Sequence, residues 1–390
     1  MQSRNSPDIF NKWGMAATIG AALQRRVWFS LQGRRLYPNL YAFLVGPPAS
    51  GKSQTVLACH ELVKSIPNIF VPGAKTTKEK FLDRLSKATR LVEGQSATTC
   101  AAFVTELVTF IQPNDQVFLN DLTDLYDCPG IWTYDTFKRD ETRVENLFLC
   151  FLAGTTPRGL AENFTKARSG MGFLSRVNLI CSDEVKPPDM YSSASVEDLT
   201  SFKEDLGQIC RLKGEMRMEP NVRREIQNWI DAGMPPKINN PRLEEYQGRR
   251  ILHFLKLCMI YAAADATKPD RMVITMRDYK KALGALLEAE SQVNIALQFS
   301  AESPAFESIK NIEAWVLEEA KAAGGAVSES VLKRKMLEEF PPHIAGSALK
   351  ELEASGFLRA SYKGTTKLFT AVGPEKNRGK DKSAVQGYGN

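Results

Sequence analysis

The sequence predicts an α/β protein, in which a three-layer domain with a parallel sheet precedes a helical lid and a small winged helix-turn-helix domain. Three observations carry this prediction. Short apolar runs alternate with helical patterns up to about residue 190, as in a parallel sheet covered by helices. Helical patterns then continue without strand signals to about residue 300. Residues 304–373 combine three helical patterns with a hairpin pattern.

The elements follow in a simple order. Pro7 and Asp8 suit a helix start, and apolar residues at helical spacing predict a helix over residues 7–31, within an N-terminal helical segment over 1–37. The remaining predicted regions are a core domain over 38–190, a helical lid over 191–303, a winged-helix domain over 304–373 and a polar, disordered tail over 374–390. Four apolar runs are the expected strands of the core sheet: 41–45, 101–105, 147–153 and 176–181.

Residues 46–53, Gly-Pro-Pro-Ala-Ser-Gly-Lys-Ser, match the phosphate-loop pattern G-x4-G-K-[ST]. An apolar run precedes this motif and a helical pattern begins at Lys52, which is the strand–loop–helix context that the motif requires. We expect Lys52 to reach the β- and γ-phosphates of ATP, and the Ser53 hydroxyl to bind Mg2+. The predicted nucleotide-binding residues here are Gly46, Pro47, Pro48, Ala49, Ser50, Gly51, Lys52, Ser53 and Gln54.

Two carboxylates compete for the role of orienting the attacking water. Asp121 ends an apolar run, but apolar residues around it recur every three or four positions, which predicts a helix with Asn114 as its N-cap. Glu106 follows the expected strand 101–105, so Glu106 is the predicted catalytic base, and a plain surface glutamate is the alternative. Thr105 stands where an aspartate is usual, which predicts weaker metal coordination at that position.

Other polar residues are candidates for contacts with the γ-phosphate. Thr155 or Thr156, at the tip of the third strand, is expected to bind the phosphate or the attacking water, unless Thr-Pro is a simple turn. Arg176 begins the fourth strand, where an arginine forms a surface ion pair or, in ring ATPases, stabilises transition-state charge in a neighbouring subunit. Arg250, beside Arg249 at the start of a lid helix, is predicted to contact the γ-phosphate of its own chain or to be an ordinary helix-start charge.

These motifs together resemble AAA+ ATPases. The segment Leu-Ser-Arg-Val-Asn-Leu is similar to the arginine-finger segment of minichromosome-maintenance helicases, where an aspartate usually stands at the Asn178 position. More closely, YPNLYAFLVGPPASGKS, TELVTFI, LTDLYDCPGIWTYDT, LAGTTP and GFLSRV resemble a P-loop family of phages and mobile elements, identified as primase-associated or replicative helicases. The resemblance covers about residues 5–300. It implies ATP and Mg2+ as cofactors and a primase or another replication protein as a partner.

The resemblance also implies contacts with DNA. Superfamily 3 and minichromosome-maintenance ATPases carry a hairpin before the strand that bears the phosphate-sensing residue, and it grips DNA phosphates inside the ring. Trp132 and Tyr134 suggest a strand here, with a turn over 138–141, so Lys138 and Arg139 are the expected DNA contacts unless the turn is only solvated.

The predicted winged-helix domain offers a second set of basic residues. Lys363 and Lys367 flank its wing, Lys333 to Lys335 is a basic run on its second helix, and residues 345–355 form the expected recognition helix. Glu351 and Glu353 on that third helix would repel phosphate. Docking of a protein is therefore an alternative to DNA binding.

Composition narrows the class of protein. A net charge of +6 over 390 residues is compatible with a polyanionic partner without requiring one. Seven scattered cysteines without a CxxC pair predict a reducing cytosol, that of a bacterium or a phage-infected host, and make a structural zinc site unexpected. No apolar run of 18 residues is present, so the sequence predicts no membrane partner.

The expected function is an ATP-driven DNA helicase or translocase that acts on single-stranded or forked DNA. It would work as a homo-oligomeric ring, with a hexamer as the expected form, in phage or mobile-element replication. A helicase loader or origin-binding initiator with a switch-like ATPase is the alternative. A remodeller that does not act on nucleic acid is a third possibility, but the sequence has no clear aromatic-hydrophobic pore signature.

Overall fold

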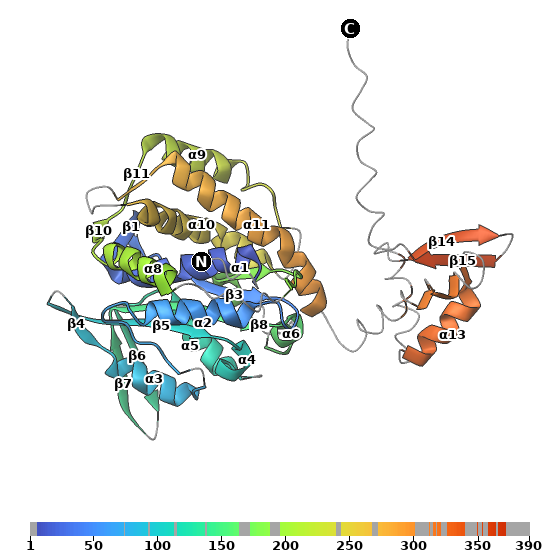
Figure 1. The fold of residues 1–390 in the computed structure, drawn as a ribbon, viewed down its shortest axis with the longest axis horizontal. Helices are drawn as coiled ribbons and strands as arrows, with labels where there is room; N and C mark the ends of the chain where they lie inside the picture. The colour runs from blue at the N-terminus through green and yellow to red at the C-terminus, as the bar shows by residue number, and fades with distance from the viewer. Residues whose placement is uncertain are drawn as a thin grey trace, which may run out of the picture. The chain divides into compact units, whose positions relative to one another are not determined.

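The computed structural model divides the chain into two compact units, residues 1–301 and 302–390 (Figure 1). In the first unit it describes residues 6–300 except 74, 93, 113–114, 137–138, 164–171, 188–195, 239–242 and 267–271. In the second unit it describes 312, 315–316, 318–320, 326–339, 349, 353, 358–363 and 366–371. The tail over 374–390 lies outside these residues. The segments predicted over 1–37, 38–190 and 191–303 all belong to the first unit.

A five-stranded sheet organises the first unit. Its spatial order is β4 (Arg90–Val92), β5 (Gln95–Val104), β8 (Leu147–Thr155), β3 (Tyr41–Val45) and β9 (Val177–Cys181). All neighbours pair in parallel except β4, which forms an antiparallel hairpin with β5. Four of these strands are those that the sequence predicts. Because they are parallel, the segments that follow them meet at one edge, which we call the carboxyl edge.

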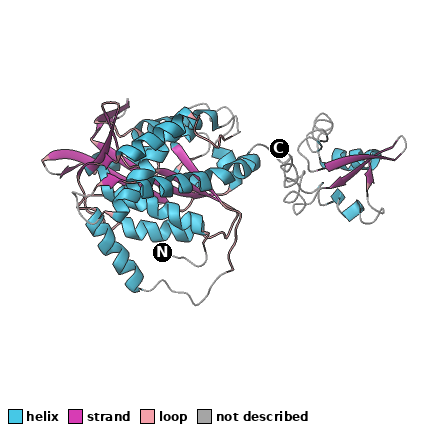
Figure 2. Ribbon diagram, turned by 90° about the horizontal axis from the view of Figure 1, so that it is seen from above, coloured by secondary structure: helices cyan, strands magenta, loops and turns pink. Residues whose placement is uncertain are grey.

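Both faces of the sheet are buried, which explains why its strands read as continuous apolar runs. Alternate residues of β3 enter two separate cores: Ala42 and Leu44 in one, and Tyr41, Phe43 and Val45 in the other. The first core contains residues of α1 (Asp8–Leu23), α2 (Lys52–Val63), α8 (Val196–Ile209) and α10 (Glu244–Asp265). The second contains residues of α3 (Lys78–Lys87), α4 (Leu107–Phe110), α5 (Gln116–Tyr126) and α6 (Pro157–Asn163). Figure 2 shows helices covering the strands, which makes three layers.

The predicted helix over residues 7–31 is wrong after Leu23. α1 ends at Leu23, where Gln24 takes a left-handed backbone conformation (φ 55°) that interrupts the helix. After a 3-10 turn, Gln24–Arg26, the chain forms β1 (Val27–Leu31), which pairs with β2 (Arg34–Leu36) across Gln32-Gly33. Both turn residues have positive φ, the geometry of a tight hairpin turn. The β-branched and aromatic residues of β1 favour this strand, so local propensity outweighed the apolar spacing.

The helical region after residue 190 packs onto the same unit. It comprises α8, α9 (Pro220–Asp231), α10 and α11 (Met276–Ser300), as the sequence predicts. β10 (Gly214–Glu215) pairs with β1 and so joins this region to the N-terminal part of the unit, whereas β11 (Arg217–Met218) pairs with β12 (Val273–Ile274) within the region itself. These residues carry no strand signal in the sequence, because two-residue strands are too short to show a period.

A β-hairpin lies between β5 and β8 in the chain. It consists of β6 (Ile131–Thr136) and β7 (Arg139–Glu145). Trp132 and Tyr134 stack on each other, with ring centroids 5.9 Å apart, and the Lys78 ammonium lies 4.9 Å from the Tyr134 ring centroid. These contacts attach the hairpin to the first turn of α3.

The second unit contains an antiparallel sheet in the order β13 (Val327–Ser328), β15 (Thr366–Ala371), β14 (Leu358–Lys363), together with α13 (Glu329–Glu339). The predicted hairpin is confirmed, with Leu358 opposite Ala371 and Lys363 opposite Thr366. Its apolar core includes Leu332 and Met336 from α13 and Phe369 from β15. No helix in the described part of the chain is both long and apolar enough to cross a bilayer.

Candidate nucleotide site at the carboxyl edge

The phosphate loop joins the end of β3 to the start of α2, as the sequence predicts. Gly51 takes a left-handed conformation (φ 80°) and Ala49 does the same (φ 62°). Such alternation curls the backbone so that successive N–H groups can converge on an anion. Gly46 must be a glycine, because a Cβ there would lie 2.6 Å from the Ser182 carbonyl oxygen. The loop is therefore confined between the helix start and the segment that follows β9.

The Lys52 side chain is buried within the loop that it follows. Its ammonium donates hydrogen bonds to the carbonyl oxygens of Gly46 (2.8 Å) and Pro47 (2.6 Å) and lies 3.1 Å from Ser50 Oγ. Burial lowers the pKa of Lys52, and the negative charge of Glu106 opposes that shift. Ser53 is half-buried and Gln54 exposed in the first turn of α2. A positive charge is thus held at the helix N-terminus, where the helix dipole also favours an anion.

Glu106 lies near this lysine and is exposed to solvent. It directly follows Thr105 at the end of β5 and is the N-cap residue of α4. Gly154, near the end of β8, lies between the two segments that bear Glu106 and Lys52: a Cβ there would lie 2.5 Å from the Thr105 carbonyl oxygen and 3.5 Å from Lys52 Cβ. The carboxyl edge therefore brings together the loop that carries the phosphate-loop motif and an exposed carboxylate.

Asp121, the competing carboxylate, belongs to a different part of the molecule. It lies on α5, which confirms the predicted helix, although the N-cap is Asp115, whose carboxylate accepts from the Phe118 N–H (3.0 Å). Asn114 lies outside the described residues. Asp121 forms an ion pair with Lys78 (2.9 Å), and both side chains are largely buried. This pairing gives Asp121 a structural role.

The two threonines after β8 have different partners. Thr156 Oγ1 accepts a hydrogen bond from the Gly159 N–H (3.0 Å), so Thr156 acts as the cap of α6. Thr155 is buried at the strand end, and its carbonyl oxygen accepts from the Gly46 N–H at 3.3 Å. Thr155 therefore lies against the phosphate loop, and Thr156 has a sufficient structural explanation.

Arg176 lies at the opposite, amino edge of the sheet. It ends a 3-10 turn, Leu174–Arg176, directly before β9. Its guanidinium forms an ion pair with Asp127 (2.8 Å) and donates to the Gly172 carbonyl oxygen (2.9 Å). Arg249 approaches the other oxygen of Asp127 at 3.5 Å. A five-residue strand spans about 16 Å, so Arg176 is far from the phosphate loop of its own chain.

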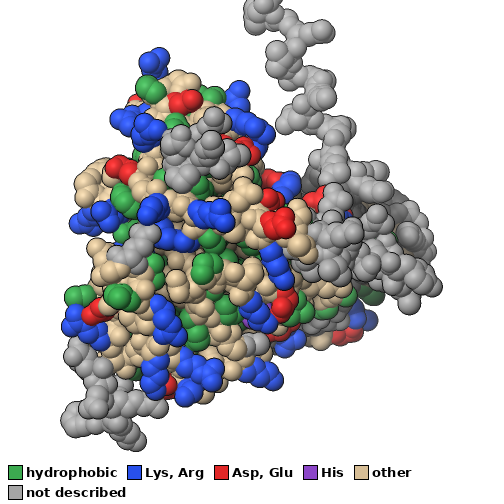
Figure 3. All heavy atoms as spheres, turned by 60° about the vertical axis from the view of Figure 1, so that its left-hand side comes forward, with side chains coloured by type: hydrophobic (Ala, Val, Ile, Leu, Met, Phe, Trp, Pro, Cys, Tyr) green, Lys and Arg blue, Asp and Glu red, His purple; other side chains and the backbone are tan. Residues whose placement is uncertain are grey.

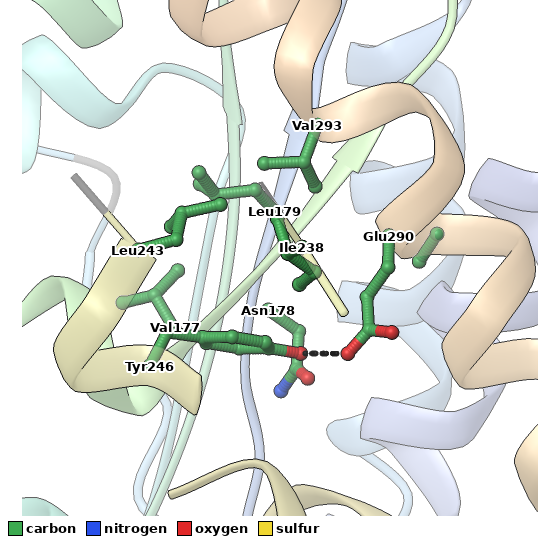
Figure 4. A pocket seen from close by; sticks show the side chains of 9 residues that line it. Val177, Asn178, Leu179, Ile238, Leu243, Tyr246, Glu290 and Val293 are labelled. Atoms are coloured by element: carbon green, nitrogen blue, oxygen red, sulfur yellow. Dashed lines mark hydrogen bonds between the residues drawn. The ribbon is translucent and has the colours of Figure 1, made fainter. Parts of the chain in front are cut away.

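The predicted contact of Arg250 with a γ-phosphate does not fit the structure. Arg250 is fully buried in the second turn of α10 and forms an ion pair with Glu290 of α11. Tyr246 donates a hydrogen bond to the same carboxylate (3.1 Å; Figure 4). Tyr246 and Glu290 also line a cavity of about 10 Å³, which has room for one water at most. Arg250 is a buried structural charge because α11 supplies its counter-ion.

The structure describes only part of the hairpin segment that is predicted to contact DNA. Lys138 lies outside the described residues, and for Arg139 only the backbone is described. Arg139 already belongs to β7, opposite Thr136, so Arg139 to Glu141 are strand residues and not the predicted turn.

The basic residues of the second unit mostly have acidic partners. Lys367 pairs with Glu353 at 2.8 Å, so this carboxylate neutralises the expected wing contact. Lys333 pairs with Glu329 (2.8 Å) and Lys335 with Glu338 (3.1 Å). Lys363 ends β14, and its side chain is not among those described. Apart from Leu349 and Glu353, the predicted recognition helix over 345–355 lies outside the described residues.

Sequence reasoning missed a buried polar network at the amino edge. His253 Nε2 lies 2.8 Å from the Ser175 carbonyl oxygen, and Lys256 donates to Asn39 Oδ1 (2.8 Å). The Lys256 ammonium also lies 3.7 Å from the Tyr126 ring centroid. Only the helical spacing of His253 and Lys256 on the inner side of an apolar helix could have pointed to them.

No protein-family model matches the chain, and a search of curated proteins found no match. No group of three or more His, Cys, Asp or Glu residues that could hold a metal ion occurs in the described part of the chain.

Proposed function

We propose that the chain is an ATP hydrolase of the AAA+ helicase type that moves along DNA as a homo-oligomeric ring. The observation that carries this proposal is the joint placement of Lys52, Glu106 and Thr155 at the carboxyl edge, while Arg176 lies at the amino edge. One chain therefore supplies the phosphate loop and the base, and only another chain can supply Arg176. A ring of copies satisfies both requirements.

Each residue has a defined part in the proposed reaction. Lys52 would exchange its three loop acceptors for oxygens of the β- and γ-phosphates. Glu106 would orient a water and accept its proton as the oxygen attacks the γ-phosphorus and the bond to the bridging oxygen breaks. Thr155 would position the γ-phosphate or the water.

Mg2+ fits the residues present, because it usually keeps waters and takes few protein ligands besides substrate phosphates. The Ser53 hydroxyl would hold the ion. Thr105 stands where an aspartate is usual and cannot supply a carboxylate, so Glu106 is the one nearby carboxylate that sequence reasoning identified. When bound, the ion supplies neutralisation of phosphate charge.

Arg176 would stabilise transition-state charge in the adjacent subunit. Its ion pair with Asp127 must first open, so phosphate competes with a carboxylate for the same guanidinium. The same ion pair supports the second candidate, a loader or initiator, because an arginine released only on assembly suits a switch. Strand displacement separates the two: a helicase unwinds a forked duplex continuously, and a loader does not.

The test measures ATP hydrolysis with and without single-stranded DNA, and the mass of the protein in the same buffer with ATP. We expect stimulation by DNA and a ring-sized mass. Arg176→Ala and Lys52→Ala should each be inactive alone, but mixed rings should regain activity, because they contain interfaces with one intact loop and one intact arginine. An unstimulated monomer, or mixing without rescue, would contradict the proposal.

A further inference from the structure

A second concave surface lies beside the nucleotide site, on a side of the chain that no motif marks. It is an open groove of about 710 Å³ between the start of α3 and the short helix α4. Lys75 and Thr77 line it from the segment before α3, Lys80 and Arg84 from α3 itself, and Thr109 and Gln112 from α4 and the residues after it. The first segment follows a single parallel bridge between Phe70 and Cys100 of β5, and the second follows β5 itself, which places the two side by side.

The groove is basic. Its described lining includes three cations, Lys75, Lys80 and Arg84, and no carboxylate. Lys80 and Arg84 are exposed and one helical turn apart, so they project from the same face of α3. Lys80 has one weak acidic neighbour, Asp83 at 3.4 Å, which Lys87 already holds at 2.6 Å. In Figure 3, which turns this side forward, basic side chains are frequent over the lower part of the face.

The chemistry of the lining selects a phosphate chain. Lysine, arginine, threonine and glutamine side chains are the groups that bind phosphate and sugar oxygens in protein–nucleic acid complexes. One valine and no aromatic residue lie in the described lining, so bases have no stacking platform here. An open groove of this kind suits a strand that passes along it, with contacts to the backbone and not to the bases.

The groove is covalently and sterically connected to the predicted catalytic base. Glu106 is the N-cap residue of α4, and Thr109 follows it by one turn. Thr109 donates to the Glu106 carbonyl oxygen twice, through its N–H (3.2 Å) and through Oγ1 (2.8 Å). A ligand that draws Thr109 towards it thus acts on the backbone that carries the Glu106 carboxylate.

We propose that this groove binds the sugar–phosphate backbone of single-stranded nucleic acid, and that Thr109 couples its occupancy to Glu106. The coupling rests on the proposed ATPase function, whereas the binding does not. Two independent measurements can therefore separate the failure of one from the failure of the other.

The binding measurement uses fluorescence anisotropy of a labelled oligodeoxythymidylate with the full chain and no nucleotide. Lys80→Gln/Arg84→Gln should weaken binding about tenfold or more, and should reduce the slope of log K against log salt by about 1.4. The matched control is Arg223→Gln/Arg224→Gln, which removes the same charge from two exposed positions of α9. Equal losses in the two variants would mean non-specific attraction and would overturn the groove.

The identity of the ligand is tested in the same assay. A duplex that binds more tightly than the single strand would overturn the proposal. So would wild-type protein that ignores the oligonucleotide but binds polyglutamate, because that result assigns the groove to an acidic protein.

The coupling measurement follows ATP hydrolysis with and without the same oligonucleotide. Thr109→Val, which removes a hydroxyl from the groove, should lose stimulation even at saturating oligonucleotide, and Thr109→Ser, which keeps the hydroxyl, should retain it. If wild type hydrolyses ATP without stimulation by DNA, the coupling is overturned while the binding result stands. If wild type does not hydrolyse ATP at all, the proposed function fails. The change in salt slope between wild type and Lys80→Gln/Arg84→Gln then decides whether the groove binds the oligonucleotide.

Discussion

The two edges of the central sheet treat charge in opposite ways. At the carboxyl edge Lys52 bonds only to uncharged oxygens of its own loop, and Glu106 is exposed. At the amino edge Arg176 is mostly buried and paired with Asp127, which Arg249 also approaches. The next residue of α10 after Arg249 is Arg250, which is buried against Glu290. One edge presents charges whose interactions a ligand can replace, and the other presents charges whose partners are already supplied.

The difference indicates which charges serve the fold and which are available for chemistry. A buried ion pair contributes little net stability, but removal of one partner leaves an uncompensated charge in a medium that solvates it poorly. A charge bonded to backbone carbonyls can exchange them for phosphate oxygens at small cost, because both are hydrogen-bond acceptors. Mutations at the carboxyl edge should therefore change activity, and mutations at the fully buried Arg250–Glu290 pair should change stability. Arg176 lies between these cases, because the Asp127 carboxylate that holds it is half exposed and can be displaced.

The largest expected effect is at Lys52. Lys52→Ala should lower ATP hydrolysis by at least about 10⁴-fold, or ~5.4 kcal/mol of transition-state stabilisation, because it removes the cation nearest the transferred phosphoryl group. Its unfolding free energy in urea should stay within about 1 kcal/mol of wild type, since no acidic partner is left buried. Lys64→Ala, at the other end of α2 and exposed, is the control and should remain active. An inactive control would point to damage to the helix and not to loss of chemistry.

Glu290 should show the reverse behaviour. Glu290→Ala should lower the unfolding free energy by about 3–5 kcal/mol, because it leaves the fully buried Arg250 without a counter-ion. Burial raises the pKa of Glu290 and the hydrogen bonds of Arg250 oppose that shift, so the pair is held by geometry that an alanine cannot replace.

Two companion variants sharpen this measurement. Arg250→Met/Glu290→Met removes both charges and should recover much of the loss. Glu288→Ala, two residues away on the same helix, breaks the exposed pair with Lys12 and should cost about 1 kcal/mol or less. If the Glu290 and Glu288 variants lose equal stability, the contrast between buried and exposed pairs is wrong for this helix.

The third prediction concerns Glu106, the exposed carboxylate of the carboxyl edge. Glu106→Gln should reduce ATP hydrolysis by about 10²–10³-fold while nucleotide binding is kept, because the amide can orient water but cannot accept its proton. Glu184→Gln removes another exposed carboxylate from the carboxyl edge, after β9, and should leave the rate within about twofold. A fully active Glu106→Gln enzyme would assign the base to another residue and would leave Glu106 as a helix cap.

Much of the fold follows from the sequence because its strands are buried on both faces. The apolar runs at 41–45 and 147–153 have no polar alternation, and such runs bounded by turns fit a parallel sheet. The end of α1 was missed because a left-handed residue, Gln24, stops it without a glycine or proline to mark the place.

The site is readable from the sequence to the extent that it is local. The phosphate loop lies within eight consecutive residues, and Glu106 is two residues beyond its strand, so spacing alone places both. Arg250 was misread because its partner Glu290 is 40 residues away, and only tertiary packing decides that the two meet. The groove along α3 was missed for the same reason: Lys80 and Thr109 have no common sequence pattern.

The smallest expected effect is a pH dependence of stability that comes from His253, in the buried polar network at the amino edge. Burial and, to a lesser extent, the cations Lys256, Arg249 and Arg176 lower its pKa to about 3, against the opposing effect of the hydrogen bond to Ser175. The folded chain therefore holds His253 neutral, whereas the unfolded chain protonates it near its usual pKa of about 6.5. His253 therefore makes its full contribution to the free energy of unfolding above a pH of about 6.5. As the pH falls from about 6.5 towards 3, this contribution is lost by up to about 1.4 kcal/mol per pH unit. Urea unfolding of wild type and His253→Gln between pH 7 and pH 5 measures the difference in slope, with His60→Gln on α2 as the control for loss of a histidine. If the His253→Gln slope were as steep as that of wild type, His253 would be protonated in the folded chain as it is in the unfolded chain. The amino edge would then admit water, and the contrast between the two edges would be lost.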